Sequence, residues 1–202
     1  MQFLKIAVLL MCACTAVLQS LYFTHMLQLN SYRPERYRKW CNENRKRLFS
    51  VRRLFPVTVL ICAFLPKLFC LITTLLIFAL TVVSNIPKKA KKPLVFTARV
   101  KRLLTTNFII TALVLLLSWW LPTGWCVAVL AIYTITLWMW VGCANAINIP
   151  FEKAVANHYV GDARRLLQEH AQLTVIGITG SYGKTSTKSF LHSLLSVRYN
   201  VL

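Results

Sequence analysis

The chain has 202 residues, 57% of them hydrophobic, and its 24 basic and 5 acidic side chains give a formal charge of +19. A mean hydropathy of +0.57 excludes an ordinary soluble domain. The basic residues lie beside apolar runs instead of on a polar domain, which argues against a nucleic-acid-binding protein. These features predict a multi-pass protein of the lipid bilayer with basic cytoplasmic loops.

Residues 1–147 are predicted to form a polytopic transmembrane domain, because apolar runs long enough to cross a bilayer follow one another closely. The predicted spans are about 3–27, 54–86, 103–121 and 125–146. A Pro-Thr-Gly turn joins the last two spans and is flanked by tryptophans, which are typical of the membrane interface. Those residues are Trp119, Trp120 and Trp125.

The run 54–86 has two interpretations. One long tilted helix would place Lys67 near the bilayer centre, at a cost of about 2.5–3.5 kcal/mol. A hairpin that turns at Pro66 and Lys67 brings the lysine to an interface and puts the flanking basic loops on one side of the membrane. Each arm of the hairpin is shorter than the ~20 residues that a full crossing prefers. We favour the hairpin.

Two connecting segments, 30–53 and 87–102, carry most of the positive charge. The first contains Arg33, Arg36, Arg38, Lys39, Arg45, Lys46, Arg47, Arg52 and Arg53, and the second contains Lys88, Lys89, Lys91, Lys92, Arg99, Lys101 and Arg102. The positive-inside rule predicts that both are cytoplasmic. Apolar residues at helical spacing in the first segment fit a helix on anionic lipid, and a solvated basic loop fits equally well.

Residues 148–172 are predicted to form a helical stalk. Pro150 suits the start of a polar helix, Gly161 is expected to break it, and Asp162 can cap the helix that follows. The isolated acids Glu152, Asp162 and Glu169 are more typical of caps and solvated faces than of catalytic carboxylates.

Residues 173–202 contain the pattern that carries chemistry. A short β-branched run from 173 to 179 predicts a buried strand, and apolar residues at helical spacing predict a helix up to about residue 198. Between them, Gly180 and Gly183 would let backbone N–H groups approach an anion at the start of that helix. Lys184 would reach the β- and γ-phosphates of ATP, and the hydroxyl of Thr185 would bind Mg²⁺.

The expected fold is therefore an α-helical membrane domain followed by the start of an α/β P-loop nucleotide-binding domain. The general P-loop pattern asks for a glycine where Ile178 stands, so it fails by one position, with Gly177 beside it. A second strand is expected to begin after the helix, and such a domain needs several more strands. The sequence is thus expected to be the N-terminal part of a longer protein and inactive alone.

Residues 179–188, Thr-Gly-Ser-Tyr-Gly-Lys-Thr-Ser-Thr-Lys, closely resemble the ATP loop of the Mur ligases, which build the peptidoglycan stem peptide. Within that family the loop is most similar to that of the ligase that adds D-alanyl-D-alanine to a UDP-muramyl tripeptide. The resemblance covers about the last quarter of the chain. The apolar N-terminal part is similar to that of a subset of Mur-ligase-like proteins with a membrane domain.

The resemblance implies a membrane-anchored ligase in the bacterial inner (plasma) membrane, with the loop in the cytoplasm. ATP and Mg²⁺ would activate a carboxylate of a UDP-muramyl peptide as an acyl phosphate, which the amine of D-alanyl-D-alanine would attack. Lys184 would be the catalytic residue and Thr185 the Mg²⁺ ligand. The nucleotide-binding residues would be Gly180, Ser181, Tyr182, Gly183, Lys184, Thr185 and Ser186.

Two alternatives remain open. A membrane-bound poly-γ-glutamate synthase has a similar design, but its loop usually carries arginine and serine where Tyr182 and Thr185 stand here. A membrane protein without catalysis, which only anchors or binds a partner, belongs to a different class.

Overall fold

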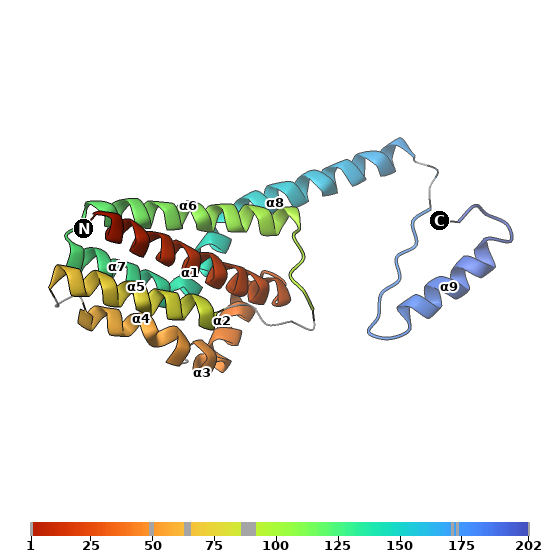
Figure 1. Ribbon diagram of the computed structural model, residues 1–202. Helices are drawn as coiled ribbons and strands as arrows, with labels where there is room; N and C mark the ends of the chain where they lie inside the picture. Colours follow the sequence, from red (N-terminus) through yellow and green to blue (C-terminus); the bar gives the residue numbers. More distant parts are fainter. Residues whose placement is uncertain are drawn as a thin grey trace. The chain divides into compact units, whose positions relative to one another are not determined.

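The computed structural model describes residues 2–48, 51–62, 66–85, 92–170, 172 and 174–201. These residues form helices and no strand, and the chain divides into two units, Met1–Ala154 and Val155–Leu202 (Figure 1). The first unit holds α1 (Gln2–Leu29), α2 (Pro34–Glu43), α3 (Arg45–Leu48), α4 (Val51–Cys62), α5 (Lys67–Ser84), α6 (Ala98–Trp120) and α7 (Thr123–Ile135). Helix α8 (Leu137–Glu169) begins in the first unit and continues into the second, which also holds α9 (Lys184–Leu195).

Three helices are long and apolar enough to cross a bilayer: α1, α5 and α6, with 28, 18 and 23 residues. Helices α7 and α8, bent by 69° at the break between them, make a fourth if the pair is one span. Large side chains on their outer faces, such as Leu76 and Leu117, are more than half exposed. Such exposure is unfavourable in water and costs nothing in hydrocarbon. The chain is a membrane protein, as its composition predicts.

The apolar run 54–86 contains two helices in the structure. Helix α4 ends at Cys62, and α5 begins at Lys67 directly after Pro66. Pro66 has φ −52° and ψ 140°, an extended conformation that cannot continue a helix. The two helices pack against each other, so Lys67 lies at an end of the bundle and not in its middle (Figure 1).

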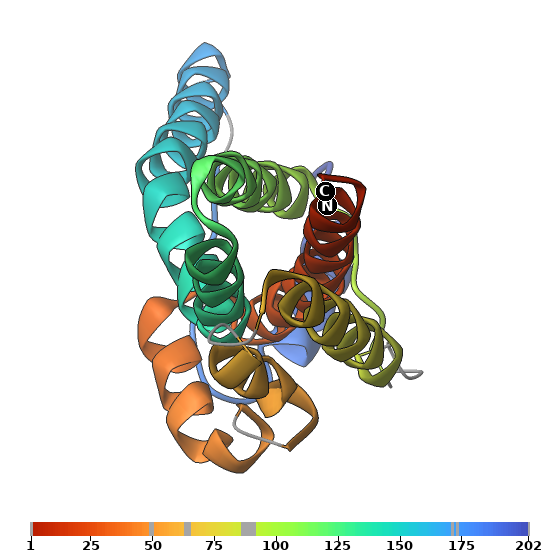
Figure 2. The ribbon, with the colours of Figure 1, turned by 60° about the vertical axis from the view of Figure 1, so that its left-hand side comes forward.

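The helices of the first unit pack side by side. Helix α1 lies against α5 and α6, and α4 lies against α5 and α7 (Figure 2). Two apolar clusters fill the space between them, one around Phe23, Leu103 and Leu137 and the other around Phe78 and Leu130. This packing positions the helix ends that carry the charged residues.

Polar side chains join the buried faces of α1, α6 and α7. The amide Nδ2 of Asn107 donates to Ser20 Oγ at 2.5 Å, and Ser20 in turn donates to the carbonyl of Ala16 at 2.6 Å. One turn further along α6, the hydroxyls of Thr111 and Tyr133 lie 2.6 Å apart. Hydrogen bonds of this kind connect helices in hydrocarbon, where the hydrophobic effect does not drive their association.

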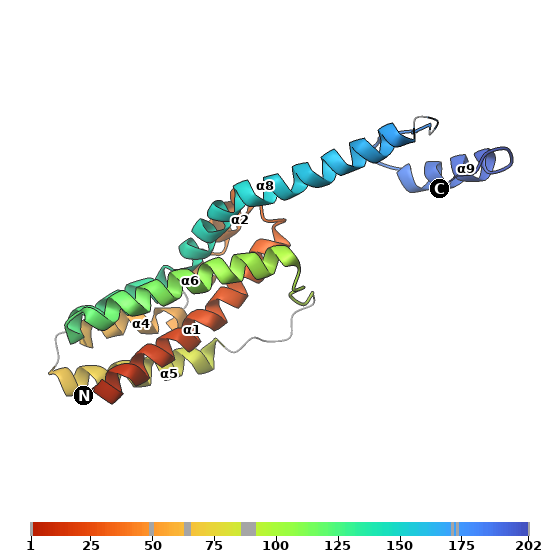
Figure 3. The ribbon, with the colours of Figure 1, turned by 90° about the horizontal axis from the view of Figure 1, so that it is seen from above.

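The two ends of the bundle differ in charge. At one end, Lys5 of α1 donates to the carbonyls of Trp119 and Leu121 at 2.7 and 3.0 Å, where α6 ends. At the other end Gln28, in the last turn of α1, exchanges two hydrogen bonds with the backbone of Val95, just before α6 begins. Helix α2 and the start of α6 lie at this second end (Figure 3), and α3 follows α2 there (Figure 1). We call it the basic end, because these segments are rich in arginine and lysine.

The predicted start of an α/β domain is wrong. Residues 174–179, expected in a strand, have no regular structure, and the described residues contain no strand with which they could pair. A β-branched run becomes a strand only when its N–H and C=O groups are hydrogen-bonded to a neighbouring strand. The helix expected behind the loop is present as α9 and ends at Leu195.

Helix α8 passes through both residues that were expected to delimit stalk helices. Pro150 lies inside it, and Gly161 continues it instead of breaking it. A glycine within a helix costs only about 1 kcal/mol relative to alanine, so an otherwise favourable helix tolerates it. Asp162 is consequently a residue of the helix interior and does not cap a new helix.

Candidate functional site

The loop between residues 180 and 183 has a backbone that requires glycine at both ends. Gly180 has φ 151° and Gly183 has φ 74°, and L-amino acids with a side chain rarely adopt such values. A Cβ at Gly183 would meet no atom within 4 Å, so the requirement there is conformational and not steric. The two glycines allow the chain to turn from residues 174–179 directly into α9.

Helix α9 begins without a side-chain cap. Gly183 is its N-cap residue, and the first helical hydrogen bond runs from Thr187 N to Gly183 O at 2.8 Å. The backbone N–H groups of Lys184, Thr185 and Ser186 precede that bond and therefore have no partner within the helix. Together with the helix dipole, these three N–H groups form a place where an anion would be stabilised.

Lys184 extends its side chain back over the loop. Its ammonium donates a hydrogen bond to the carbonyl of Gly180, four residues earlier. The positive charge is thereby held beside the free N–H groups at the start of α9. An anion bound there would meet backbone donors and an ammonium together, which is the arrangement that a phosphate requires.

The hydroxyls of Thr185 and Ser186 are the oxygen ligands that this loop offers to a cation. Neither hydroxyl has a hydrogen-bond partner among the described residues, although Ser189 Oγ donates to the Thr185 carbonyl at 3.1 Å. Within the described part of the chain no group of three His, Cys, Asp or Glu side chains could hold a metal. A Mg²⁺ ion at this loop would therefore take most of its ligands from phosphate and water.

The predicted site residues are all brought together in the second unit, and all are open to their surroundings. Tyr182 is 96% exposed, and no described residue of α9 is buried. Of the acids that the sequence offers nearby, Glu169 pairs with Arg165 at 3.2 Å within α8, and no ion pair joins an acid to Lys184 in the described residues. The loop residues are thus exposed, and no described acid pairs with the lysine of the loop.

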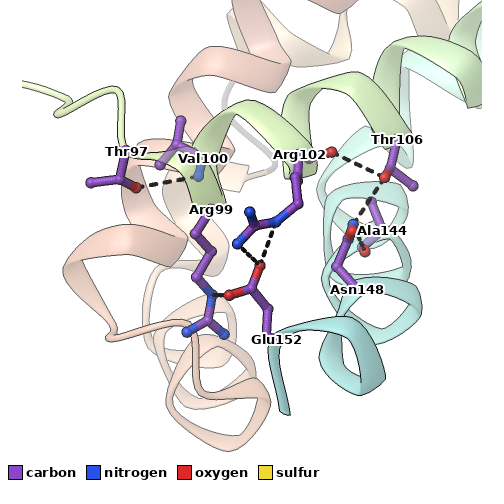
Figure 4. A network of polar contacts seen from close by, with 8 residues as sticks. All are labelled: Thr97, Arg99, Val100, Arg102, Thr106, Ala144, Asn148 and Glu152. Atoms are coloured by element: carbon purple, nitrogen blue, oxygen red, sulfur yellow. Dashed lines mark hydrogen bonds and ion pairs between the residues drawn. The ribbon is translucent and has the colours of Figure 1, made fainter. Parts of the chain in front are cut away.

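A second polar cluster, in the first unit, was not expected from the sequence. Arg102 donates from Nε and from a terminal nitrogen to one oxygen of Glu152, at 2.9 and 2.6 Å (Figure 4). The other oxygen of Glu152 lies 3.8 Å from Nε of Arg99. One turn along both helices, Asn148 Nδ2 donates to the hydroxyl of Thr106 at 2.9 Å. The cluster fastens α8 to α6 at the basic end.

The sequence held one signal for this cluster. Glu152 is the only acid between residues 44 and 161, so the basic residues at the start of α6 have no other carboxylate in that part of the chain. Arg99 and Arg102 are three residues apart and share one face of a helix. The side chain of Glu152 is only 16% exposed, which corrects the expectation that this residue is solvated.

Comparison with protein-family models, with curated proteins and with solved structures finds no match to this chain.

Proposed function

We propose that the chain belongs to a membrane-anchored, ATP-dependent amide ligase of the Mur type, which joins D-alanyl-D-alanine to a UDP-muramyl peptide. The observation that supports this proposal best is the loop 180–186. Two glycines with positive φ lead directly into an uncapped helix, and the first residue of that helix is a lysine whose ammonium lies over the loop. This is the chemistry of a site for the phosphates of a nucleotide.

In this proposal each part of the loop has one task. The N–H groups from Lys184 to Ser186 bind phosphate oxygens, and the ammonium of Lys184 neutralises charge on the β- and γ-phosphates. The hydroxyl of Thr185 holds Mg²⁺. ATP supplies the phosphoryl group that activates a carboxylate of the muramyl peptide. The backbone of Ser181 and Tyr182 completes the cradle.

The proposal places the protein in the bacterial inner membrane with the loop in the cytoplasm, where ATP is available. The basic end of the bundle is the cytoplasmic end under the positive-inside rule. Helix α8 runs antiparallel to α6, since residues 102 and 106 meet residues 152 and 148, and it therefore leaves the bundle at that end. In a background without native cysteines, the thiol introduced by Ser193→Cys should react with an impermeant maleimide only after intact cells are permeabilised.

Nucleotide binding is the step to measure first. The full chain in detergent should bind a fluorescent ATP analogue in the presence of Mg²⁺, and unlabelled ATP should displace the analogue. Adenosine should fail to do so, because the proposed contacts are to phosphates and not to the base. Displacement by adenosine as good as that by ATP, or no binding of the analogue at all, would rule the proposal out.

Replacement of Gly183 by alanine should weaken ATP binding by about fivefold to thirtyfold. A Cβ at φ 74° costs about 1–2 kcal/mol, and this cost depopulates the loop conformation that presents the N–H groups. Gly177→Ala is the matched control, because Gly177 has no positive φ and a Cβ there meets nothing within 4 Å. Titration of each variant with labelled ATP makes the comparison, and equal losses in the two variants would contradict the assignment.

A further inference from the structure

A cavity of about 290 Å³ lies between α2 and the first turns of α8 in the first unit. Its floor is formed by Leu27, Tyr37, Cys41 and Asn145, each at most 4% exposed. Its rim is exposed and includes Met139. The volume is close to the lower end of the range of about 300–1,000 Å³ that is usual for small-molecule sites. A site of this size takes part of a lipid and not a whole one.

The polar groups of the floor already have partners. The hydroxyl of Tyr37 donates to the carbonyl of Trp138 at 3.1 Å, and the amide of Asn145 donates to the carbonyl of Tyr32 at 3.2 Å. None of the described residues that line the cavity is acidic. The remaining charged group is the guanidinium of Arg38, which is exposed at the rim and forms no ion pair with any described residue. The cavity therefore suits a ligand with an apolar body and one anionic group.

The position of the cavity along α1 indicates which class of ligand could reach it. Leu27 belongs to the last turn of α1, a helix long and apolar enough to cross a bilayer, and α2 follows after four residues. We therefore expect the cavity to lie near one surface of the bilayer. A site at this level faces lipid headgroups on one side and acyl chains on the other. Helix α2 and its flank carry Arg33, Arg36, Arg38 and Lys39 against Glu35 and Glu43, and this excess of positive charge favours anionic lipids over zwitterionic ones.

We infer that this cavity binds an anionic phospholipid, with part of an acyl chain against Leu27 and Met139 and with the phosphate on Arg38. The bound lipid fixes α2 at the membrane surface beside α8. The inference is independent of the proposed ligase activity, because it uses no residue of the second unit.

Arg38→Ala should weaken the binding of phosphatidylglycerol about tenfold, because it removes a charge-assisted hydrogen bond to the phosphate. Arg36→Ala is the matched control: it removes the same charge from the same helix, but Arg36 does not line the cavity, and we expect a change of less than about threefold. Native mass spectrometry of the full chain, titrated with phosphatidylglycerol in detergent, counts the bound lipid. Equal losses in the two variants would show diffuse attraction to a basic helix and would overturn the inference.

Binding measurements with two further ligands test whether the cavity binds a lipid or only its phosphate group. Phosphatidylcholine with the same acyl chains should bind at least about tenfold more weakly, because its headgroup has no net charge. Glycerol phosphate, which has no acyl chain, should not displace bound phosphatidylglycerol. Displacement by glycerol phosphate, or equal binding of both lipids, would contradict the assignment of an acyl chain to the cavity.

A variant that fills the cavity leaves its charge unchanged. Ala146 is an exposed rim residue, so Ala146→Phe should close the cavity without disturbing the core, and should weaken phosphatidylglycerol binding about as much as Arg38→Ala. Ile147→Phe is its control, because Ile147 is 61% exposed and does not line the cavity. Circular dichroism should give the same helix content for both variants. Full retention of lipid by Ala146→Phe would exclude this cavity as the site.

A chemical probe of the same cavity is present in the chain. Cys143 is exposed at the rim, whereas Cys41 is buried at the floor, where burial raises the pKa of its thiol and a hydrogen bond with Tyr37 offsets only part of that rise. Cys14 is the other exposed thiol among the described cysteines, and the side chain of Cys62 lies outside the described residues, so both are replaced by serine in the background protein. In that background, maleimide should react with Cys143 first. Phosphatidylglycerol should slow that reaction severalfold, and a rate that the lipid does not change would count against the inference.

Discussion

Replacing Lys184 with alanine should weaken the binding of Mg-ATP by about tenfold to a hundredfold. The ammonium is expected to make charge-assisted hydrogen bonds to the phosphates, and a bond of this kind contributes about 1.5–3 kcal/mol. Lys184 lies at the first position of α9 and already reaches back to the carbonyl of Gly180, so it needs no rearrangement of the helix to meet a phosphate. Titration of the full chain with a fluorescent ATP analogue in the presence of Mg²⁺ measures the effect.

The control for Lys184→Ala removes the same charge from the far end of the same helix. Arg198 follows α9, beyond its last residue Leu195, and its guanidinium lies over the ring of Tyr199. Arg198→Ala should change the affinity by less than about twofold, since an exposed charge at that distance is screened by salt. If both variants bind ATP as tightly as the unchanged protein, the assigned role of Lys184 is refuted.

Hydropathy predicted the membrane character of the chain, because an apolar run of about 20 residues has few structures open to it other than a helix in lipid. The same kind of local pattern misled at residues 174–179. Val175, Ile176 and Ile178 show that the segment suits a strand, but a strand also needs a partner, and a short run of residues says nothing about partners. The helix behind the loop could be predicted because it depends on residues adjacent in sequence, and the phosphate-binding role of the glycines and the lysine stays a prediction.

The contacts between distant helices could not be predicted in the same way. Arg102 and Glu152 are 50 residues apart, and their meeting depends on how α6 and α8 pack and on their register. The sequence pattern also predicted a break at Gly161, and α8 continues through this residue to Glu169. A single glycine costs too little to end a helix that its neighbours favour.

The ion pairs of Glu152 should contribute most to the stability of the bundle among the charged contacts of the first unit. Its side chain is 16% exposed, and those of Arg99 and Arg102 are 35% and 32% exposed. Glu152→Gln would leave two partly buried guanidinium groups without a carboxylate. Removal of one partner from a fully buried pair costs about 3–5 kcal/mol, and the partial exposure of the arginines reduces our expectation to about 1–3 kcal/mol.

Thermal unfolding of the full chain in detergent can test this expectation with the cysteines of the bundle as reporters. Cys12, Cys41, Cys70 and Cys126 are buried, and a thiol-reactive fluorogenic dye should reach them only when the helices separate. Cys14→Ser and Cys143→Ser remove the exposed thiols among the described cysteines, and Cys62→Ser removes the cysteine whose side chain lies outside the described residues. The control is Glu43→Gln, because Glu43 and Lys39 form a pair at 4.0 Å with side chains 60% and 79% exposed, worth about 0–0.5 kcal/mol. Glu152→Gln should lower the midpoint by several degrees and Glu43→Gln by little. Equal midpoints for the two variants would mean that the ion pairs of Glu152 do not stabilise the packing of α8 against α6.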